Sequence, residues 1–106
     1  MTNVIQKIDP NSRVAPFYSY SNVTTAVSAP IKTSGGFLHS ITFNKPVATG
    51  TVIIADVTSA FATTIIGTIT VPASPQPVTL FYDIEFASGL SLVVGTAAQD
   101  ITVSYL

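Results

Sequence analysis

The sequence predicts an all-β fold, an antiparallel β-sandwich or jelly-roll-like domain with an extended N-terminal arm or edge strands. From residue 36 onward, short stretches that alternate apolar with polar residues are separated by Gly, Pro, Asn and Asp, as in strands joined by turns. Thr, Val and Ile are abundant, and these residues favour a pleated surface over a helix. No segment carries the i, i+3, i+4, i+7 spacing of an amphipathic helix over a useful length. Six short strands in this arrangement are typical of a sandwich or a jelly roll.

The first expected strand covers residues 37–43. Alternation places Phe37, His39, Ile41 and Phe43 on one of its faces. His39 is the single histidine, so any catalytic triad or histidine-ligated metal site would depend on it alone. No Gly-x-Ser-x-Gly nucleophile motif accompanies it. A hydrogen-bonded or interface histidine is therefore expected, and the chain is not expected to be an enzyme.

Turn residues delimit the other five expected strands. They cover residues 51–57, 63–71, 78–86, 90–94 and 100–105. Residues 56–62 are expected to form a loop or a wide hairpin connection. The three prolines within residues 72–77 exclude a helix or an inner strand there, because each removes a backbone donor. Gly67 falls on the apolar face of its strand, which indicates a bulge or a side chain that crosses close to the backbone.

The strand at residues 78–86 has the clearest alternation in the chain. Its expected inward residues are Val78, Leu80, Tyr82, Ile84 and Phe86, and its outward residues are Thr79, Phe81, Asp83 and Glu85. Asp83 and Glu85 would lie about 7 Å apart, a separation that glycosidases use and that could contribute to a calcium site. Calcium takes about six to eight oxygen ligands, however, and no further acidic residue is near in sequence. A solvated outer face or an ion pair with a neighbouring subunit is expected instead, with no metal and no cofactor.

Four tyrosines could build a sugar-binding platform, because aromatic rings stack on sugar faces. They are Tyr18, Tyr20, Tyr82 and Tyr105. Tyrosines of this kind are more often core or interface residues with the hydroxyl at the rim, and the absence of Trp weakens the sugar interpretation.

The first third of the chain differs from the rest. Pro10, Pro16 and Pro30 interrupt it, and short extended pieces are expected at residues 4–8, 14–20 and 23–27. Two interpretations remain open. These pieces are edge strands of the same sandwich, or they form an arm that lies partly on a neighbouring subunit. The domain division is therefore residues 1–34 for the arm and edge strands, and residues 35–106 for the sandwich.

The chain has few charges, and their scarcity predicts assembly. Lys and Arg number 4 and Asp and Glu 5 among 106 residues, or 8%, where a soluble domain has roughly 25%. Charged residues keep a lone protein soluble and protect its sheet edges from association. The net charge of −1 gives no reason to expect nucleic acid or an anionic membrane as a partner. Cysteine is absent, which excludes disulfides and thiolate metal sites.

The N-terminal residues contain no apolar run of signal-peptide length. The strongest apolar stretch, residues 52–55, is far too short to span a bilayer. Synthesis in a cytoplasm without secretory processing is expected.

Residues 36–106 resemble small structural proteins of tailed bacteriophages, in particular the capsid decoration (cement) proteins of the phage head. The segments that carry the resemblance are GFLHSITFNKP (36–46), GTVII (50–54), PVTLFYDI (77–84), SGL (88–90) and DITVSY (100–105). The resemblance covers about two-thirds of the chain and leaves the first third unmatched. It implies a β-sandwich or β-tulip-like module, often trimeric, that binds where capsid subunits meet.

The resemblance makes a non-enzymatic virion protein the leading hypothesis, with the major capsid protein and further copies of itself, as a homotrimer, as partners. Its expected location is the capsid surface of the virion, after synthesis in the cytoplasm of the bacterial host. The residues expected at the subunit or capsid interface are Phe17, Tyr18, Tyr20, Val14 and Ile5, because aromatic anchors carry much of an interface's energy. The alternatives are a tail, neck or head-fibre component, and a carbohydrate-binding module for host attachment.

Overall fold

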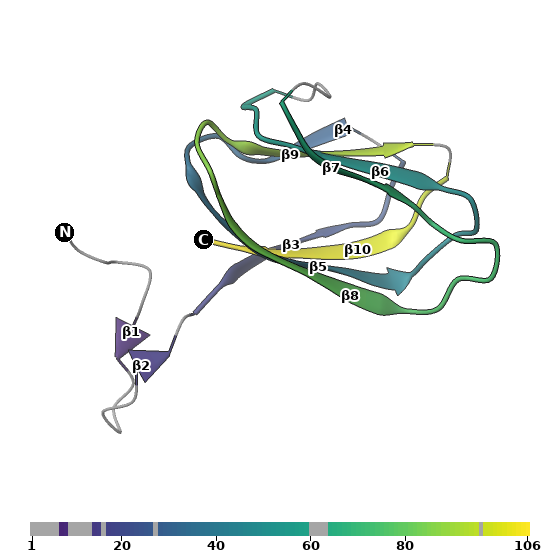
Figure 1. Cartoon of the computed structure of the whole chain (residues 1–106), viewed down its shortest axis with the longest axis horizontal. Helices are drawn as coiled ribbons and strands as arrows, with labels where there is room; N and C mark the ends of the chain where they lie inside the picture. Colours follow the sequence, from purple (N-terminus) through teal and green to yellow (C-terminus); the bar gives the residue numbers. More distant parts are fainter. Residues whose placement is uncertain (1–6, 9–13, 16, 27, 60–63, 96) are drawn as a thin grey trace.

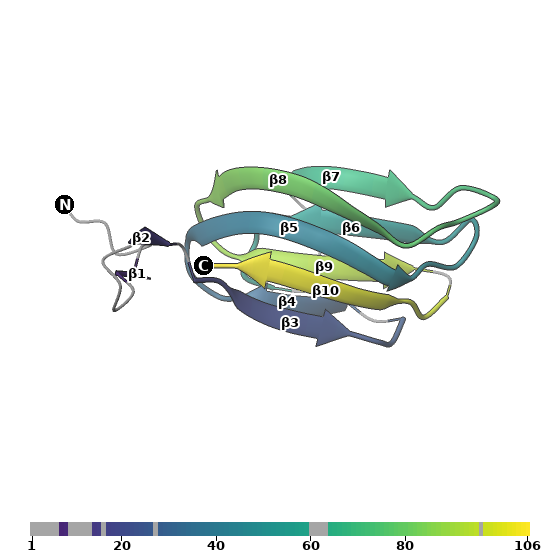
Figure 2. The same ribbon diagram turned by 90° about the horizontal axis from the view of Figure 1, so that it is seen from below.

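The computed structural model describes residues 7–8, 14–15, 17–26, 28–59, 64–95 and 97–106, and they contain strands and no helix. Two four-stranded antiparallel sheets pack face to face (Figures 1 and 2). The first sheet has the order β3-β10-β5-β8 and the second the order β4-β9-β6-β7. The eight strands are β3 (Ser19–Val23), β4 (Ser28–Lys32), β5 (Gly36–Lys45), β6 (Thr51–Ala55), β7 (Ile65–Thr70), β8 (Val78–Phe86), β9 (Leu90–Gly95) and β10 (Asp100–Tyr105). The predicted all-β sandwich is confirmed.

The connectivity is that of a jelly roll. The chain crosses from one sheet to the other at every step from β3 to β6, forms the β6–β7 hairpin in the second sheet, and then crosses at every step to β10. Eight strands in two such sheets are the arrangement that viral capsid and lectin domains share with the cupins.

The first third of the chain contributes strands of two kinds. β3 and β4 are outermost in their sheets, paired with β10 and β9, which corresponds to the edge-strand interpretation of this segment. β1 (Lys7–Ile8) and β2 (Val14–Ala15) pair only with each other among the described strands, and Figure 1 shows them beside the sandwich rather than within it. Whether this N-terminal part also acts as an arm stays a prediction.

The core lies between the two sheets, because each strand turns its alternate apolar residues inward. Both sheets contribute side chains that are almost fully buried. The most buried side chains are Leu38, Ile41, Phe43, Ile101 and Val103 of the first sheet and Val52, Ile54, Leu90 and Leu92 of the second. This core is large enough for the sandwich to fold without disulfides or a metal.

The first sheet carries a bulge that widens from strand to strand. On β10, the residues opposite Ser40 and Leu38 are adjacent in sequence, so His39 is an additional residue of β5. On β8, the residues opposite Ser40 and Leu38 are Phe81 and Ile84, so two residues, Tyr82 and Asp83, lie between them. Asp83 has a φ of 49°, in the left-handed region, which non-glycine residues adopt mainly at turns and bulges. Such bulges re-aim side chains, and this one determines where the polar groups of the sheet lie.

The expected face of His39 was wrong, and the bulge is the reason. Alternation had placed it with Ile41 and Phe43, which are both buried. Leu38 and Ile41 both point into the core although they are three residues apart, because His39 is inserted between them. His39 is thereby placed on the outer side of the sheet, where it meets Asp83.

The expected inward residues of β8 are confirmed in part. Leu80, Tyr82 and Phe86 pack with the core. Val78 and Ile84 keep 45% and 38% of their surfaces exposed, because β8 is an edge strand.

The expected close crossing at Gly67 is confirmed, and Tyr82 is the residue that crosses. A Cβ atom at Gly67 would lie 2.9 Å from the Tyr82 hydroxyl oxygen, so this hydroxyl approaches β7 more closely than a larger residue at position 67 would allow. Burial raises the pKa of the Tyr82 hydroxyl.

Asp56 stabilises the turn between β8 of the first sheet and β9 of the second. Its carboxylate accepts hydrogen bonds from the backbone amides of Ala87 and Ser88, each at 2.8 Å, and of Gly89 at 3.2 Å. The amide of Ala87, followed by that of Ser88, lowers the pKa of the Asp56 carboxyl. The loop expected at residues 56–62 is confirmed at residues 56–59, and residues 60–62 lie outside the described part of the chain.

Candidate functional site

The outer face of the first sheet carries exposed aromatic rings at both edges. Strand register places Tyr20, Ser104, Ser40 and Phe81 in one row across all four strands. Tyr20 on β3 and Phe81 on β8 keep 73% and 66% of their surfaces exposed. Three interstrand spacings separate the two edge strands, or about 14 Å. This set of four residues is called the Tyr20–Phe81 row below.

An aromatic cluster lies beside this row at the bulge. The rings of Tyr18 and His39 are stacked, with centroids 4.2 Å apart and an interplanar angle of 5°. His39 also meets the ring of Phe81 edge to face at 5.4 Å. The His39 Nδ1 atom lies 2.6 Å from a carboxylate oxygen of Asp83. The bulge residues therefore position the Phe81 ring at its end of the row.

A ladder of polar side chains flanks the other side of the row. Asn22, Thr102, Thr42 and Thr79 lie opposite one another across the four strands. The Thr42 and Thr79 hydroxyls share a hydrogen bond of 2.9 Å.

Two asparagines and an aspartate link this ladder to the end of β10. The Asn22 amide donates to the Asp100 carboxylate at 2.7 Å. The Asn44 amide donates to Asp100 at 3.2 Å and to the Thr102 hydroxyl at 3.0 Å. Side chains from three strands are thereby held in fixed positions on this face.

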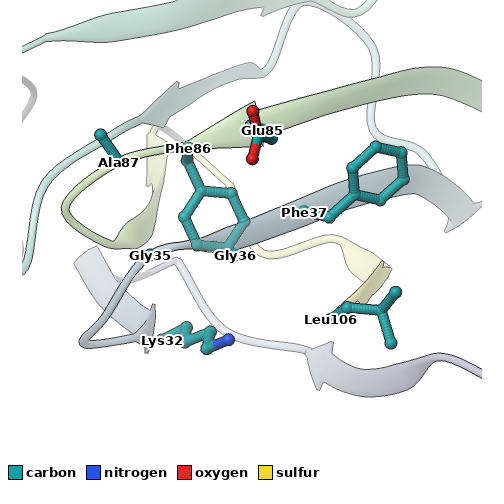
Figure 3. A pocket seen from close by; sticks show the side chains of 8 residues that line it. All are labelled: Lys32, Gly35, Gly36, Phe37, Glu85, Phe86, Ala87 and Leu106. Atoms are coloured by element: carbon teal, nitrogen blue, oxygen red, sulfur yellow. The ribbon is translucent and has the colours of Figure 1, made fainter. Parts of the chain in front are cut away.

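An open hollow of about 850 Å³ lies at the end of the sandwich where β8 turns into β9 (Figure 3). Its lining residues are Lys32, Gly35, Gly36, Phe37, Glu85, Phe86, Ala87 and Leu106. Lys32 and Glu85 lie on opposite sides of the Phe86 ring, and the main chain of Leu106 is hydrogen-bonded to that of Phe37. The two charged lining residues thus lie on either side of an aromatic ring, and the other lining residues are glycines and apolar residues.

The long side of the sandwich between β7 and β8 is apolar and incompletely covered. A hollow of about 360 Å³ opens there, lined mainly by Phe43, Ile69, Val71, Val78, Leu80 and neighbouring prolines. Ile65 on β7 is 53% exposed, and Val78 and Ile84 are exposed on β8. We call the exposed residues Ile65, Val78 and Ile84, together with this hollow, the apolar seam.

The structure separates the four tyrosines into two pairs. Tyr82 and Tyr105 pack against the core and are poorly placed to form a platform. Tyr18 and Tyr20 lie on the outer face of the first sheet. Phe81 also lies on this face, although it was not among the rings proposed for a platform from the sequence. The alternation of residues 78–86 had already predicted that it points outward.

The predicted interface residues are placed only in part. Phe17 is 45% exposed and lies two residues before the start of β3. Val14 lies in β2, where the backbone alone is described, and Ile5 lies outside the described residues. Their role at an interface stays a prediction.

The acidic residues of β8 belong to no cluster of three or more His, Cys, Asp or Glu residues within the described part of the chain. The Asp83 carboxylate lies 2.6 Å from the His39 ring of the same chain, and an ion pair with a neighbouring subunit stays a prediction. Glu85 lies opposite Phe37, beside the Leu38–Ile84 pair that follows the bulge.

No protein family, curated protein or solved structure matches the chain. Within the described ranges, no helix is long and apolar enough to cross a membrane.

Proposed function

We propose that this chain is a non-enzymatic structural protein of a phage virion, a capsid decoration protein that binds between capsid subunits and stabilises the head. In this proposal it is made in the host cytoplasm, assembles as a homotrimer and binds the major capsid protein at the capsid surface. The mechanism is mass action, because a partner that binds only the assembled shell adds its binding free energy against rupture of the shell.

The apolar seam is the observation that carries the proposal. Ile65 on β7 and Val78 and Ile84 on β8 are exposed on the two edge strands of this side, and Val78 also lines the apolar hollow. Exposed apolar surface of this kind marks sites of protein association. β7 has no charge and no proline, which are the usual devices that keep an edge strand from pairing with another chain.

Two further features support the proposal. Charged residues make up 8% of the chain, which suits surfaces that are buried in an assembly, since burial of an unpaired charge is costly. The jelly-roll fold is one that viral capsid domains use, although the same fold serves lectins and enzymes as well.

Quantitative mass spectrometry of virions purified from the phage that encodes the chain tests the proposal. The expected result is a copy number comparable with that of the major capsid protein. A small fraction of that number would instead indicate a tail, neck or head-fibre component, and absence from the virion would overturn the proposal.

A loading assay then tests the seam. Ile65→Asp and Val78→Asp should abolish binding to shells that lack the protein, while Thr68→Asp on the outer face of the second sheet, also exposed, should bind normally. Thermal unfolding verifies that each variant is folded. Removal of residues 1–15, which leaves β3 intact, tests the predicted arm in the same assay. Equal loading by all variants would contradict both the seam and the arm.

A further inference from the structure

The Tyr20–Phe81 row combines two kinds of surface that amphipathic ligands require. Its ends are exposed aromatic rings, and its centre is two serines on the inner strands β10 and β5. Ser104 is partly exposed, and its hydroxyl can exchange a hydrogen bond with a ligand, whereas Ser40 keeps only 6% of its surface exposed and is covered by its neighbours. Sugars present C–H faces that pack on rings and hydroxyls that exchange hydrogen bonds with side chains such as these.

We propose that the Tyr20–Phe81 row, with the neighbouring polar ladder, is a binding site for a neutral oligosaccharide. The span between its rings, about 14 Å at the interstrand spacing, exceeds a single sugar ring and suits a short chain of sugars. This site does not depend on the virion function proposed above and uses none of the seam residues.

The ladder supplies acceptors for sugar hydroxyls. Asn22 and Asn44 donate their amide groups to Asp100 and Thr102. Each carbonyl oxygen therefore keeps its capacity to accept a hydrogen bond from a ligand. Because these amides are already fixed by internal bonds, binding does not have to order them, which lowers its entropic cost.

The bulge supplies rigidity at the other end of the row. Phe81 is held by edge-to-face contact with His39, which is itself stacked on Tyr18 and bonded to Asp83. A ring that is held in place offers its face to a ligand without loss of rotamer freedom.

The charges on this face select for a neutral ligand. Asp83, Glu85 and Asp100 are acidic, and neither the row nor the ladder contains a Lys or an Arg, although Lys45 lies opposite Asp100 at the start of β10. An anionic sugar or a nucleic acid would be repelled, since both require basic side chains. The centre of a protein interface is usually apolar and depleted in serine, whereas the inner strands contribute serines to this row, so the row favours a sugar over the protein contact that the sequence predicted for Tyr20.

Titration of the ¹⁵N-labelled full chain, followed by amide chemical shifts, tests the proposal. The probes are maltotetraose, cellotetraose, laminaritetraose, mannotetraose and chitotetraose, with 3′-sialyllactose as the anionic comparison. At least one neutral probe should shift the amides of Ser40, Ser104 and their neighbours, with a Kd of about 1 mM or lower.

Single substitutions of the rings complete the test. Tyr20→Ala and Phe81→Ala should each weaken binding about tenfold, the loss expected for one aromatic contact. Both side chains are largely exposed, so the fold should be retained, and thermal unfolding verifies this. Thr68→Ala, an exposed change on the outer face of the second sheet, is the control and should leave the Kd unchanged.

Four results would overturn the proposal. They are no response to any neutral probe up to about ten times the expected Kd, shifts confined to another surface, unchanged binding in both ring variants, and a preference for 3′-sialyllactose. Loading of shells does not enter this test, so the site and the virion function can fail separately.

Discussion

The two sheets are alike on their inner faces and different on their outer faces. Inside, each supplies fully buried aliphatic residues to one core. Outside, the first sheet carries aromatic rings and side chains that bond from strand to strand, such as Thr42 with Thr79 and His39 with Asp83. The outer face of the second sheet has instead a row of Ser28, Val93, Ile53 and Thr68, with no charge.

This difference separates stability from recognition. The inner faces are required by the fold, so both sheets must have them. Side-chain hydrogen bonds between neighbouring strands of an outer face are not required, and among the described residues they lie on the first sheet, whereas Ser91 of the second sheet donates to loop carbonyls. We therefore assign recognition of polar ligands to the first sheet.

The largest expected effect tests the equivalence of the inner faces. Leu38→Ala in the first sheet and Leu92→Ala in the second should each lower the free energy of unfolding by about 3 kcal/mol, because each leaves a cavity in the same core. Chemical denaturation measures both. If one substitution is nearly neutral, the two sheets do not share a core as described.

A smaller effect concerns Asp56, which connects the two sheets. Asp56→Asn should lower the free energy of unfolding by about 1–2 kcal/mol at neutral pH, because three backbone amides lose a charged acceptor. The folded-state pKa of this carboxyl lies below its ordinary value of 3.8. The contribution is therefore complete above pH 3.8 and is lost as the pH falls through the folded-state pKa.

Denaturation over a pH series measures this contribution. The difference between the parent chain and the Asp56→Asn variant should shrink as the solution is acidified. A difference that stays constant with pH would show that the charge of Asp56 does not stabilise the turn.

The smallest effect sharpens the contrast between the outer faces. Asp100→Ala should cost about 1 kcal/mol, because the amides of Asn22 and Asn44 lose a shared acceptor. Thr70→Ala, an exposed change on the second sheet, should stay within about 0.5 kcal/mol. Urea denaturation measures both changes. If the two substitutions lower the free energy of unfolding equally, the hydrogen-bonded outer face of the first sheet does not differ in stability from the outer face of the second.

Most of the fold could be predicted from period-two alternation, because half-buried strands impose that period on the sequence. The limits appear at the bulge. β8 has two additional residues there. An even number leaves the alternation of inward and outward side chains unchanged, so the faces of β8 could be predicted from the sequence. β5 has one additional residue, which reverses the alternation of inward and outward side chains at that point. His39 was therefore assigned to the wrong face. Nothing in the local composition around His39 indicates the insertion.

The candidate site was less predictable than the fold. Tyr18 and Tyr20 were recognised as candidate rings, and the outward direction of Phe81 was also apparent. Their placement on one face depends on the pairing of β3 and β8 with different inner strands, which a single sequence does not specify. The partnership of His39 with Asp83, 44 residues later, follows from the bulge and could not be inferred without it.

The position of His39 has a consequence for how this protein can change over evolution. If His39 were deleted, Leu38 and Ser40 would become neighbours, and every other residue of β5 would keep its present direction. The histidine is thus superfluous to the hydrophobic pattern that folds the chain. Gain, loss or replacement of a single residue at this point can remodel the recognition face while the core sequence remains untouched.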